Sequence, residues 1–137
     1  MQRVLILCTA NSARSQMAEG LLRWDHGARF EVASAGARAT QVRPEAIQAM
    51  KEIGIDISGH RSKAVDEFAG ESFDYVITVC DSASETCPVY SGHTNRIHHN
   101  FEDPAATLGP EEERLASFRR VRDQLRAYLR VFAADHP

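Results

Sequence analysis

Short apolar runs alternate along this chain with longer stretches in which apolar residues recur at helical spacing. Residues 4–7 (VLIL) are apolar at every position, which is typical of a strand buried on both faces of a sheet. Small and polar residues follow, and between positions 17 and 22 the apolar residues are spaced as on one face of a helix. Residues 30–33 (FEVA) predict a second strand. It leads into residues 34–36, where Gly36 would supply a turn.

The next stretch predicts a helix that begins at Pro44 and ends before Gly54. Proline suits the first turn of a helix, and glycine suits the position just past its end. Ile47, Met50 and Ile53 would give this helix one apolar face.

Two more strands and a long helix complete the pattern. The polar residues 58–68 are expected to form a short helix anchored by Val65 and Phe68. Residues 73–79 (FDYVITV) predict the third strand, and residues 94–99 the fourth. A final helix is expected over residues 110–134. Its inward stripe comprises Leu115, Phe118, Val121, Leu125, Leu129 and Phe132.

Strands that alternate with helices predict a parallel sheet. We therefore expect a single three-layer α/β domain over residues 1–137, with a four-stranded parallel sheet flanked by helices. In such open sheets, ligands bind beyond the carboxyl ends of the strands. Cys8 ends the first predicted strand, Cys80 follows the third and Asp103 lies beyond the fourth, so these side chains should converge at one edge.

Composition and charge exclude several functions. Lys and Arg number 16 against 19 Asp and Glu, so the net charge of -3 offers no basic surface for nucleic acid. No apolar stretch reaches the roughly 20 residues of a membrane span, and the first apolar run is too short for a signal peptide. We expect a cytoplasmic monomer without nucleic-acid or membrane partners. Three cysteines, an odd number, favour thiols that cycle or bind metal over a permanent disulfide framework.

The segment VLILCTANSARS places Cys8 where a strand enters a tight loop before a helix. The backbone N–H groups of such a loop can surround an oxyanion, with the helix dipole behind them and Arg14 as a bidentate clamp. The pKa of a free cysteine, about 8.5, falls to roughly 3.5–7.5 in this setting, so Cys8 is expected to be a thiolate nucleophile. Ser15 is expected to hydrogen-bond the thiolate and Asn11 to brace the loop, although ordinary capping and turn roles stay open for both. The predicted oxyanion-binding loop comprises Thr9, Ala10, Asn11, Ser12, Ala13, Arg14 and Ser15.

Asp103 is the candidate general acid. An oxygen that departs during thiolate attack on an oxyanion leaves poorly unless it is protonated, and a carboxyl group on a loop can supply the proton. Asp103 precedes Pro104, so a turn-forming Asp-Pro pair is the alternative. Its position beyond the fourth predicted strand favours the catalytic role.

Cys80 and Cys87 are separated by the six residues DSASET. Zinc-binding cysteine pairs are usually two to four residues apart, so this pair is a weak metal site even with His93, His98 and His99 downstream. A reversible disulfide fits better, because the small polar residues between the cysteines allow a helical turn that could loosen.

Taken together, these residues resemble the thioredoxin-coupled arsenate reductases, which share the fold of the low-molecular-weight protein tyrosine phosphatases. Both groups carry the spacing of Cys8, Arg14 and Ser15, and the cysteines at positions 80 and 87 are the reductase feature. The likeness runs through most of the chain. It includes SAG at 34–36, PEAIQAMKEIGIDISGH at 44–60, DPA at 103–105 and FRRVRDQL at 118–125.

The resemblance implies an arsenate-detoxifying enzyme that has no bound cofactor and receives its electrons from thioredoxin. In that family Cys8 would attack arsenate, Asp103 would protonate the departing oxygen, and Cys80 and then Cys87 would carry a disulfide outward. Some members hold a potassium ion with an Asn, a Glu, a Ser and an Asp. Asn11, Glu19 and Ser34 match, but Lys63 stands in place of the Asp. An ammonium there would replace the ion, while a solvated lysine is the alternative.

Two other functions stay open. A phosphatase acting on phosphotyrosine or small phosphate esters would use Cys8 alone and leave the other thiols incidental. Such enzymes usually carry aromatic residues beside the loop, and none stands near Thr40 and Gln41. A non-catalytic redox or oxyanion sensor would signal through Cys80 and Cys87, but it would not need Asp103.

Overall fold

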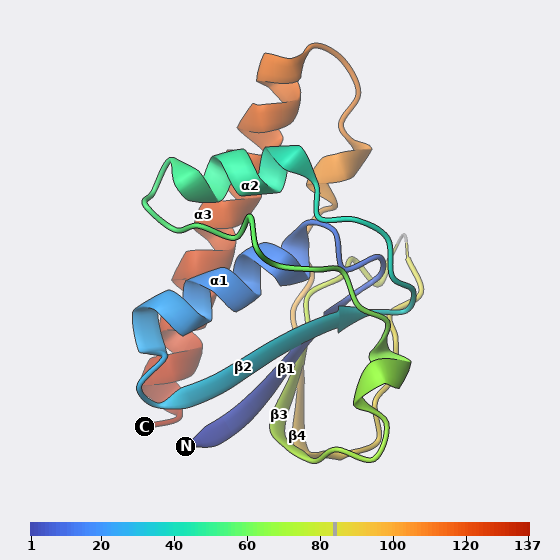
Figure 1. Cartoon of the computed structure of the whole chain (residues 1–137), viewed down its shortest axis with the longest axis vertical. Helices are drawn as coiled ribbons and strands as arrows, with labels where there is room; N and C mark the ends of the chain where they lie inside the picture. The colour runs from blue at the N-terminus through green and yellow to red at the C-terminus, as the bar shows by residue number, and fades with distance from the viewer. Residues whose placement is uncertain (84) are drawn as a thin grey trace.

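The predicted alternation of strands and helices is present in the computed structural model, which describes residues 1–83 and 85–137 (Figure 1). The fold is a single α/β domain built on a four-stranded parallel sheet. Its elements, in chain order, are β1 (Gln2–Cys8), α1 (Arg14–His26), β2 (Phe30–Gly36), α2 (Pro44–Lys51), the 3₁₀ helix η1 (Val65–Phe68), β3 (Phe73–Thr78), β4 (His93–His98), the 3₁₀ helix η2 (Pro104–Ala106) and α3 (Glu111–Asp135).

The strand order β2-β1-β3-β4 makes β1 a central strand. In register, Leu7 of β1 lies opposite Ala35 on one side and Thr78 on the other. The carboxyl ends of β1 and β3 therefore lie next to each other, and the Val79 N–H donates to Leu7 O at 2.9 Å. This register brings the segments that contain Cys8 and Cys80 to the same edge of the sheet.

Alternate residues of β1 pack into two separate clusters. The first cluster takes Val4 and Ile6 of β1 together with the buried faces of α1, α2 and α3. It includes the predicted stripe of the last helix from Phe118 to Phe132, and Leu115 at the start of that stripe is buried as well. The second takes Leu5 and Leu7 together with Tyr90, and partly buried residues of η1 pack against it. The α-helices thus share one face of the sheet, and η1 and the connecting segments cover part of the other.

Residues 34–36 do not turn as predicted. They continue β2 to Gly36, whose N–H donates to Lys63 O at 2.9 Å. A Cβ atom at Gly36 would lie 2.7 Å from both Asn11 N and Thr9 O. Glycine is therefore required there because the loop after β1 passes directly against the strand.

The apolar face of α2 is also shifted from the prediction. Ala46, Ala49 and Met50 are fully buried, whereas Ile47 and Ile53 are only partly buried against the core. The predicted helix end is confirmed in its geometry: Gly54 has φ of 81°, and the next N–H donates back to Met50 O at 3.0 Å.

Of the predicted helix at residues 58–68, only η1 forms. Two of the preceding residues donate to the loop after β1 where a helix would use its own backbone carbonyls. Ser62 Oγ donates to Ala10 O at 3.1 Å, and the Lys63 N–H donates to Asn11 Oδ1 at 2.8 Å. Tertiary hydrogen bonds thus replace the local ones that a helix would need.

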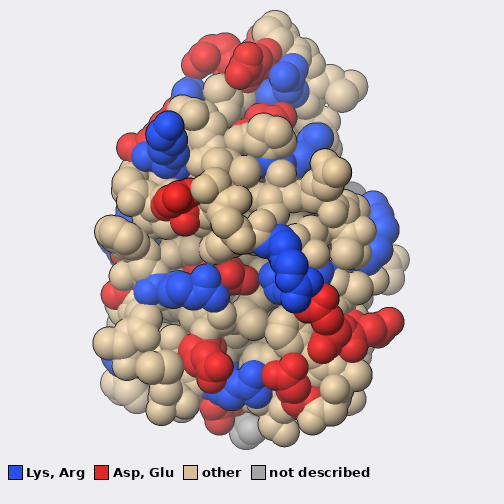
Figure 2. All heavy atoms as spheres, in the orientation of Figure 1, with Lys and Arg blue, Asp and Glu red and all other residues tan. Residues whose placement is uncertain are grey.

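On the molecular face shown in Figure 2, acidic and basic side chains are interspersed. Elsewhere and on this face alike, charged side chains of the described residues often form ion pairs. Examples from the whole domain are Arg119 with Glu52 at 2.8 Å and Arg61 with Glu67 at 2.6 Å. An anionic ligand would therefore be attracted by a local site and not by a broad basic surface. Among the described residues, no helix has the length and apolar character that crossing a membrane requires.

Candidate active site

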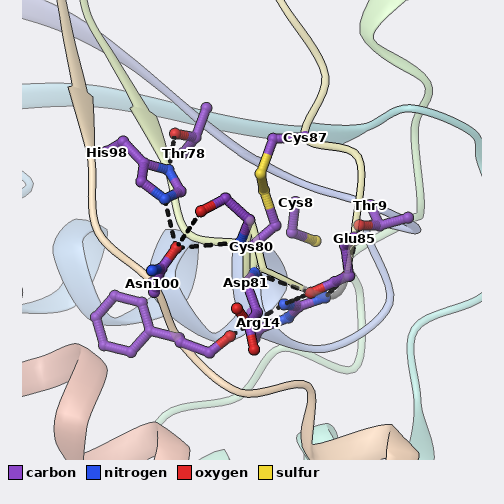
Figure 3. Close-up of a disulfide and its surroundings, with 12 residues drawn as sticks. Cys8, Thr9, Arg14, Thr78, Cys80, Asp81, Glu85, Cys87, His98 and Asn100 are labelled. Carbon is purple, nitrogen blue, oxygen red and sulfur yellow. Dashed lines mark hydrogen bonds and ion pairs between the residues drawn. A yellow bond between two sulfur atoms is a disulfide. The ribbon is translucent and has the colours of Figure 1, made fainter.

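Cys8 lies at the carboxyl end of β1, where the chain enters the loop that leads to α1 (Figure 3). Its side chain is buried, and its Sγ lies 2.8 Å from Ser15 Oγ. Asn11 Nδ2 donates to the same Ser15 Oγ at 2.7 Å. Because that oxygen already accepts from Asn11, the Ser15 hydroxyl proton is free to point at Cys8 Sγ.

Asn11 ties the loop to three other parts of the chain. Its backbone is left-handed, with φ of 48°, a conformation that asparagine tolerates better than most residues. Its Nδ2 also donates to Ser34 Oγ at 3.0 Å, and its Oδ1 accepts from Gln16 Nε2 and from the Lys63 N–H, each at 2.8 Å. Since the Asn11 side chain is fully buried, these bonds fix the loop against β2, α1 and the segment before η1.

Arg14 begins α1, and only 3% of its surface is exposed. Its two terminal nitrogens bind the two carboxylate oxygens of Glu85 at 2.5 and 2.6 Å. Nη1 also donates to Phe101 O at 3.1 Å, and Nη2 lies 4.0 Å from Asp103 Oδ2. Burial lowers the pKa of Arg14, but the hydrogen bonds of Glu85 and the negative charges of Cys8 and Asp103 raise it more, so its net pKa is raised. The Arg14 guanidinium, which the sequence predicts to bind an oxyanion, thus binds the Glu85 carboxylate.

Glu85 is a site residue that the sequence did not indicate. Besides Arg14, it accepts hydrogen bonds from Thr9 Oγ1 at 2.6 Å and from the Asp81 N–H at 2.9 Å. Burial raises the pKa of Glu85. The hydrogen bonds from Arg14, Thr9 and Asp81 lower this pKa by more than burial raises it, so the net pKa is about 2. Its place between Cys80 and Cys87 was the one available signal.

Cys80 and Cys87 form a disulfide with a Cα–Cα distance of 6.0 Å, and Cys8 is a free thiol. Cys80 is fully buried, whereas Cys87 is half-buried. Between them the Glu85 N–H donates to Asp81 O at 2.9 Å, which closes one helix-like turn as the sequence suggested. Ser84, which belongs to that predicted turn, lies outside the described residues.

A metal site is the alternative use of these cysteines. Among the described residues, one ligand atom each from Cys80, Cys87 and His98 lies within 4.8 Å of the others. His98 is already engaged, with Nδ1 2.6 Å from Thr78 Oγ1 and Nε2 2.6 Å from Asn100 Oδ1. Sulfurs joined in a disulfide offer no thiolate, so this set could bind a metal only in the dithiol state.

Asp103 lies beyond β4, at the start of η2. Its Oδ1 accepts from the Ala105 N–H at 3.0 Å, and its side chain is 37% exposed. The turn-forming role and the position near Arg14 are therefore both present. Asp103 also lines a groove beside the loop, together with Ala10, Ser12, Arg38, Thr40, Gln41, Arg43 and Ala105. The lining contains no aromatic side chain.

Glu19 and Lys63 meet where the resemblance implied a cation site. Ser34 Oγ donates to Glu19 Oε1 at 2.7 Å, and Lys63 Nζ lies 3.8 Å from the same oxygen. Arg23 and His60 approach the other Glu19 oxygen at 3.0 and 3.5 Å. Burial lowers the pKa of Lys63, partly offset by the charge of Glu19. The Lys63 ammonium therefore lies beside the buried carboxylate and does not project into solvent.

A strand that ends in a buried cysteine, a loop closed by an arginine and a flanking Asp-Pro define a phosphatase-like oxyanion site. Residues 3–135 match the family described as low molecular weight phosphotyrosine protein phosphatase, and the chain belongs to that family. An arsenate reductase of Halalkalibacterium halodurans is 45% identical over 130 residues, covering 95% of this chain and 94% of the relative.

Two solved structures described as arsenate reductases are also similar to this chain. A structure described as an arsenate reductase in the oxidized state has a TM-score of 0.83 and 32% identity, covering 98% of both chains. Another, described as an arsenate reductase in the phosphate binding state, has a TM-score of 0.80 and 31% identity over the full length of both.

Proposed function

We propose that this protein reduces arsenate to arsenite through a relay of its three cysteines and is regenerated by thioredoxin. The observation that carries the proposal is the arrangement of sulfurs: a free Cys8 on the oxyanion loop and a Cys80–Cys87 disulfide at the adjacent strand end. A dithiol gives up two electrons when it becomes a disulfide, and two electrons convert As(V) to As(III). Relatives named arsenate reductase, 45% identical, support the same substrate.

The first step is nucleophilic attack by Cys8. Arsenate would bind against the loop N–H groups and Arg14, whose planar fork suits two oxygens of a tetrahedral anion. The Cys8 thiolate forms a bond to arsenic, an As–O bond breaks, and the departing oxygen leaves as water after receiving a proton from Asp103. The hydrogen bond from Ser15 supports the charged sulfur.

The second and third steps move the disulfide. The Cys80 thiolate attacks Cys8 Sγ, the S–As bond breaks, and its electron pair remains on arsenic, which leaves as arsenite. The Cys87 thiolate then attacks Cys80 Sγ, which forms the Cys80–Cys87 disulfide and releases Cys8 as a thiolate. The disulfide with a free Cys8 corresponds to the end of this relay.

Regeneration requires a dithiol reductant, and we assign this role to thioredoxin. Cys80 is buried, so the disulfide is accessible mainly through the half-buried Cys87, and Val89 nearby is a 76% exposed apolar side chain available for contact. Electrons that arrive by thiol exchange make a bound cofactor unnecessary. We also infer a cytoplasmic location, because disulfides in that compartment are usually transient, as this relay requires.

A phosphatase side activity follows from the same site, because hydrolysis of a phosphate ester needs only Cys8, Arg14 and Asp103. The groove beside the loop is lined by polar and small residues such as Thr40 and Gln41. A phenyl ring would find no aromatic partner among these lining residues, so we expect phosphotyrosine hydrolysis to be weak.

The substitution Cys87→Ser tests the relay. The first two steps remain possible, so we expect a burst of about one arsenite per chain, followed by arrest with Cys8 joined to Cys80. Thioredoxin, thioredoxin reductase and NADPH should sustain turnover of the unchanged protein but not of this variant. Peptide mapping would identify the trapped disulfide.

Reduced Cys87→Ser should keep its hydrolysis of p-nitrophenyl phosphate, which serves as the internal control for folding. Normal thioredoxin-dependent turnover by this variant would show that Cys87 is not the outer thiol. No arsenite from the unchanged protein, with the phosphatase activity intact, would favour the phosphatase.

A further inference from the structure

The Glu85 carboxylate occupies the Arg14 guanidinium, the group that is expected to bind the substrate. It takes both terminal nitrogens of Arg14, at 2.5 and 2.6 Å, and it accepts from Thr9 Oγ1 at 2.6 Å (Figure 3). Arg14 and Thr9 both belong to the oxyanion loop. A carboxylate presents two oxygens to a guanidinium much as an oxyanion edge does. Glu85 therefore occupies the guanidinium fork that an arsenate or phosphate would use.

We propose that Glu85 is an internal ligand of the oxyanion site, which closes the site in the disulfide state and leaves it when the disulfide is reduced. The proposal rests on the proposed function, because it takes Arg14 as the oxyanion clamp. Glu85 and an oxyanion compete for one guanidinium fork, so only one of them can be bound bidentately at a time.

The disulfide couples this contact to the redox state. Glu85 lies within the segment closed by the Cys80–Cys87 bond, whose cysteines are seven positions apart. A short closed loop keeps a group on it at high effective concentration near its target. Reduction opens the loop, so holding Glu85 on Arg14 then costs more conformational entropy. The same two-electron, two-proton reduction by a dithiol that restores Cys80 and Cys87 thereby frees Arg14.

The exchange also gives Arg14 a carboxylate partner once the oxyanion has left. Arg14 is buried, and a buried cation without a partner is strongly unfavourable. When arsenite departs and the disulfide moves to Cys87, the Glu85 carboxylate takes over the guanidinium. The spent enzyme would then exclude arsenate, which it has no electrons to reduce.

The test compares binding of inorganic phosphate to the dithiol and disulfide forms, by NMR titration of the loop amides. We expect the disulfide form of the unchanged protein to bind phosphate at least about tenfold more weakly, since apparent affinity falls with the fraction of open sites. Glu85→Gln should restore most of that affinity in the disulfide form. Glu67→Gln, which removes a bidentate but exposed partner of Arg61, is the matched control and should leave the tenfold difference in place.

A second measurement separates this switch from a purely structural ion pair. If Glu85 stabilises only the disulfide state, Glu85→Gln makes the disulfide about tenfold easier to reduce, which corresponds to about 30 mV toward less negative potential. A structural pair present in both states would leave the potential unchanged. The potential is measured by equilibration in dithiothreitol buffers, with peptide mapping to show that Cys80 and Cys87 are the cysteines joined.

Equal phosphate affinity of the two forms of the unchanged protein would overturn the inference while leaving the oxyanion site in place. An unchanged potential in Glu85→Gln would overturn it as well. Failure of the dithiol form to bind phosphate at all would instead overturn the oxyanion site itself, and with it the proposed function.

Discussion

The loop that carries Cys8 is held by hydrogen bonds of buried side chains to three neighbouring segments, whereas most described residues of the Cys80–Cys87 segment are half-buried or exposed. Asn11 and Ser15 in the first are fully buried. In the second, Ser82 and Ala83 are exposed, and the ties run mainly through Glu85 and through Asn100, which accepts from the Ser82 N–H at 3.1 Å.

This difference matches what the proposed relay would require of each segment. A nucleophile and its anion-binding groups must return to the same geometry in every cycle, so their supports are buried and satisfied. Thiols that pass a disulfide outward must change partners, and segments that rearrange are drawn from the less stable parts of a structure. Cys8 and Arg14 thus belong to the fixed part of the site, and Cys87 and Glu85 to the part that rearranges.

The largest expected effect comes from Cys8→Ser in the fixed loop. We expect arsenate reduction and p-nitrophenyl phosphate hydrolysis both to fall by at least about a thousandfold, because both begin with the same thiolate. Steady-state arsenite release and nitrophenol release measure the two activities. Cys87→Ser, in the segment that rearranges, should lose only the first. Near-normal activity of either kind in Cys8→Ser would contradict the assignment of the nucleophile to this loop.

Arg14→Lys should reduce kcat/KM for arsenate by about a hundredfold or more, since a single ammonium cannot present two donors in one plane. Arg43, which lines the groove but lies outside the loop, is the matched control. We expect Arg43→Lys to change kcat/KM by less than about threefold, as is usual for a surface substitution. Unchanged phosphate affinity in Arg14→Lys would place the clamp elsewhere.

A stability measurement compares the supports of the two segments directly. Asn11→Ala removes four buried side-chain hydrogen bonds and puts alanine at a left-handed position, so we expect a loss of about 2 kcal/mol or more in the free energy of unfolding. Ser82→Ala removes one exposed bond to Asn100 and should cost at most about 0.5 kcal/mol. Urea unfolding of the disulfide form measures both. Similar costs would contradict the assignment of a fixed and a rearranging segment.

Most of the fold could be predicted from sequence because its signals are local. Every position of residues 4–7 is apolar, and the stripe of α3 repeats at helical spacing, so both elements form where expected. The face of α2 was harder to predict because Ala46 and Ala49 carry little hydrophobic signal. They are buried since α2 packs close to its neighbours, where a Cβ at Gly20 would lie 3.0 Å from the Met50 side chain.

The candidate site also contains residues that could be predicted from the sequence and one that could not. Cys8, Arg14 and Ser15 could be predicted because one loop between a strand and a helix contains them all. Glu85 could not, since an acidic residue in this short segment of small and polar residues belongs to no periodic pattern. Its partner Arg14 is 71 positions away, and only the adjacency of β1 and β3 brings the two together.

The smallest expected effect concerns the cation site behind the loop. Lys63 Nζ lies 3.8 Å from Glu19 Oε1, and its side chain is only 12% exposed, so we hypothesise that this ammonium occupies the place of a monovalent cation. Melting temperature and arsenate reduction should then be the same in potassium and in tetramethylammonium at equal ionic strength. Chloride would be the anion in both buffers.

Lys63→Gln provides the contrast, because it leaves Glu19 and Ser34 in place and removes the charge. Potassium at ten times its dissociation constant would stabilise this variant by about 1.4 kcal/mol. For a domain of this size, that is a rise of about 5 °C in melting temperature. Arg61→Gln, which removes an exposed guanidinium two positions away, should show no such rise. A potassium-specific rise in the unchanged protein would show that Lys63 does not fill the site. No rise in Lys63→Gln would show that Glu19, already paired with Arg23, has no vacancy for the ion.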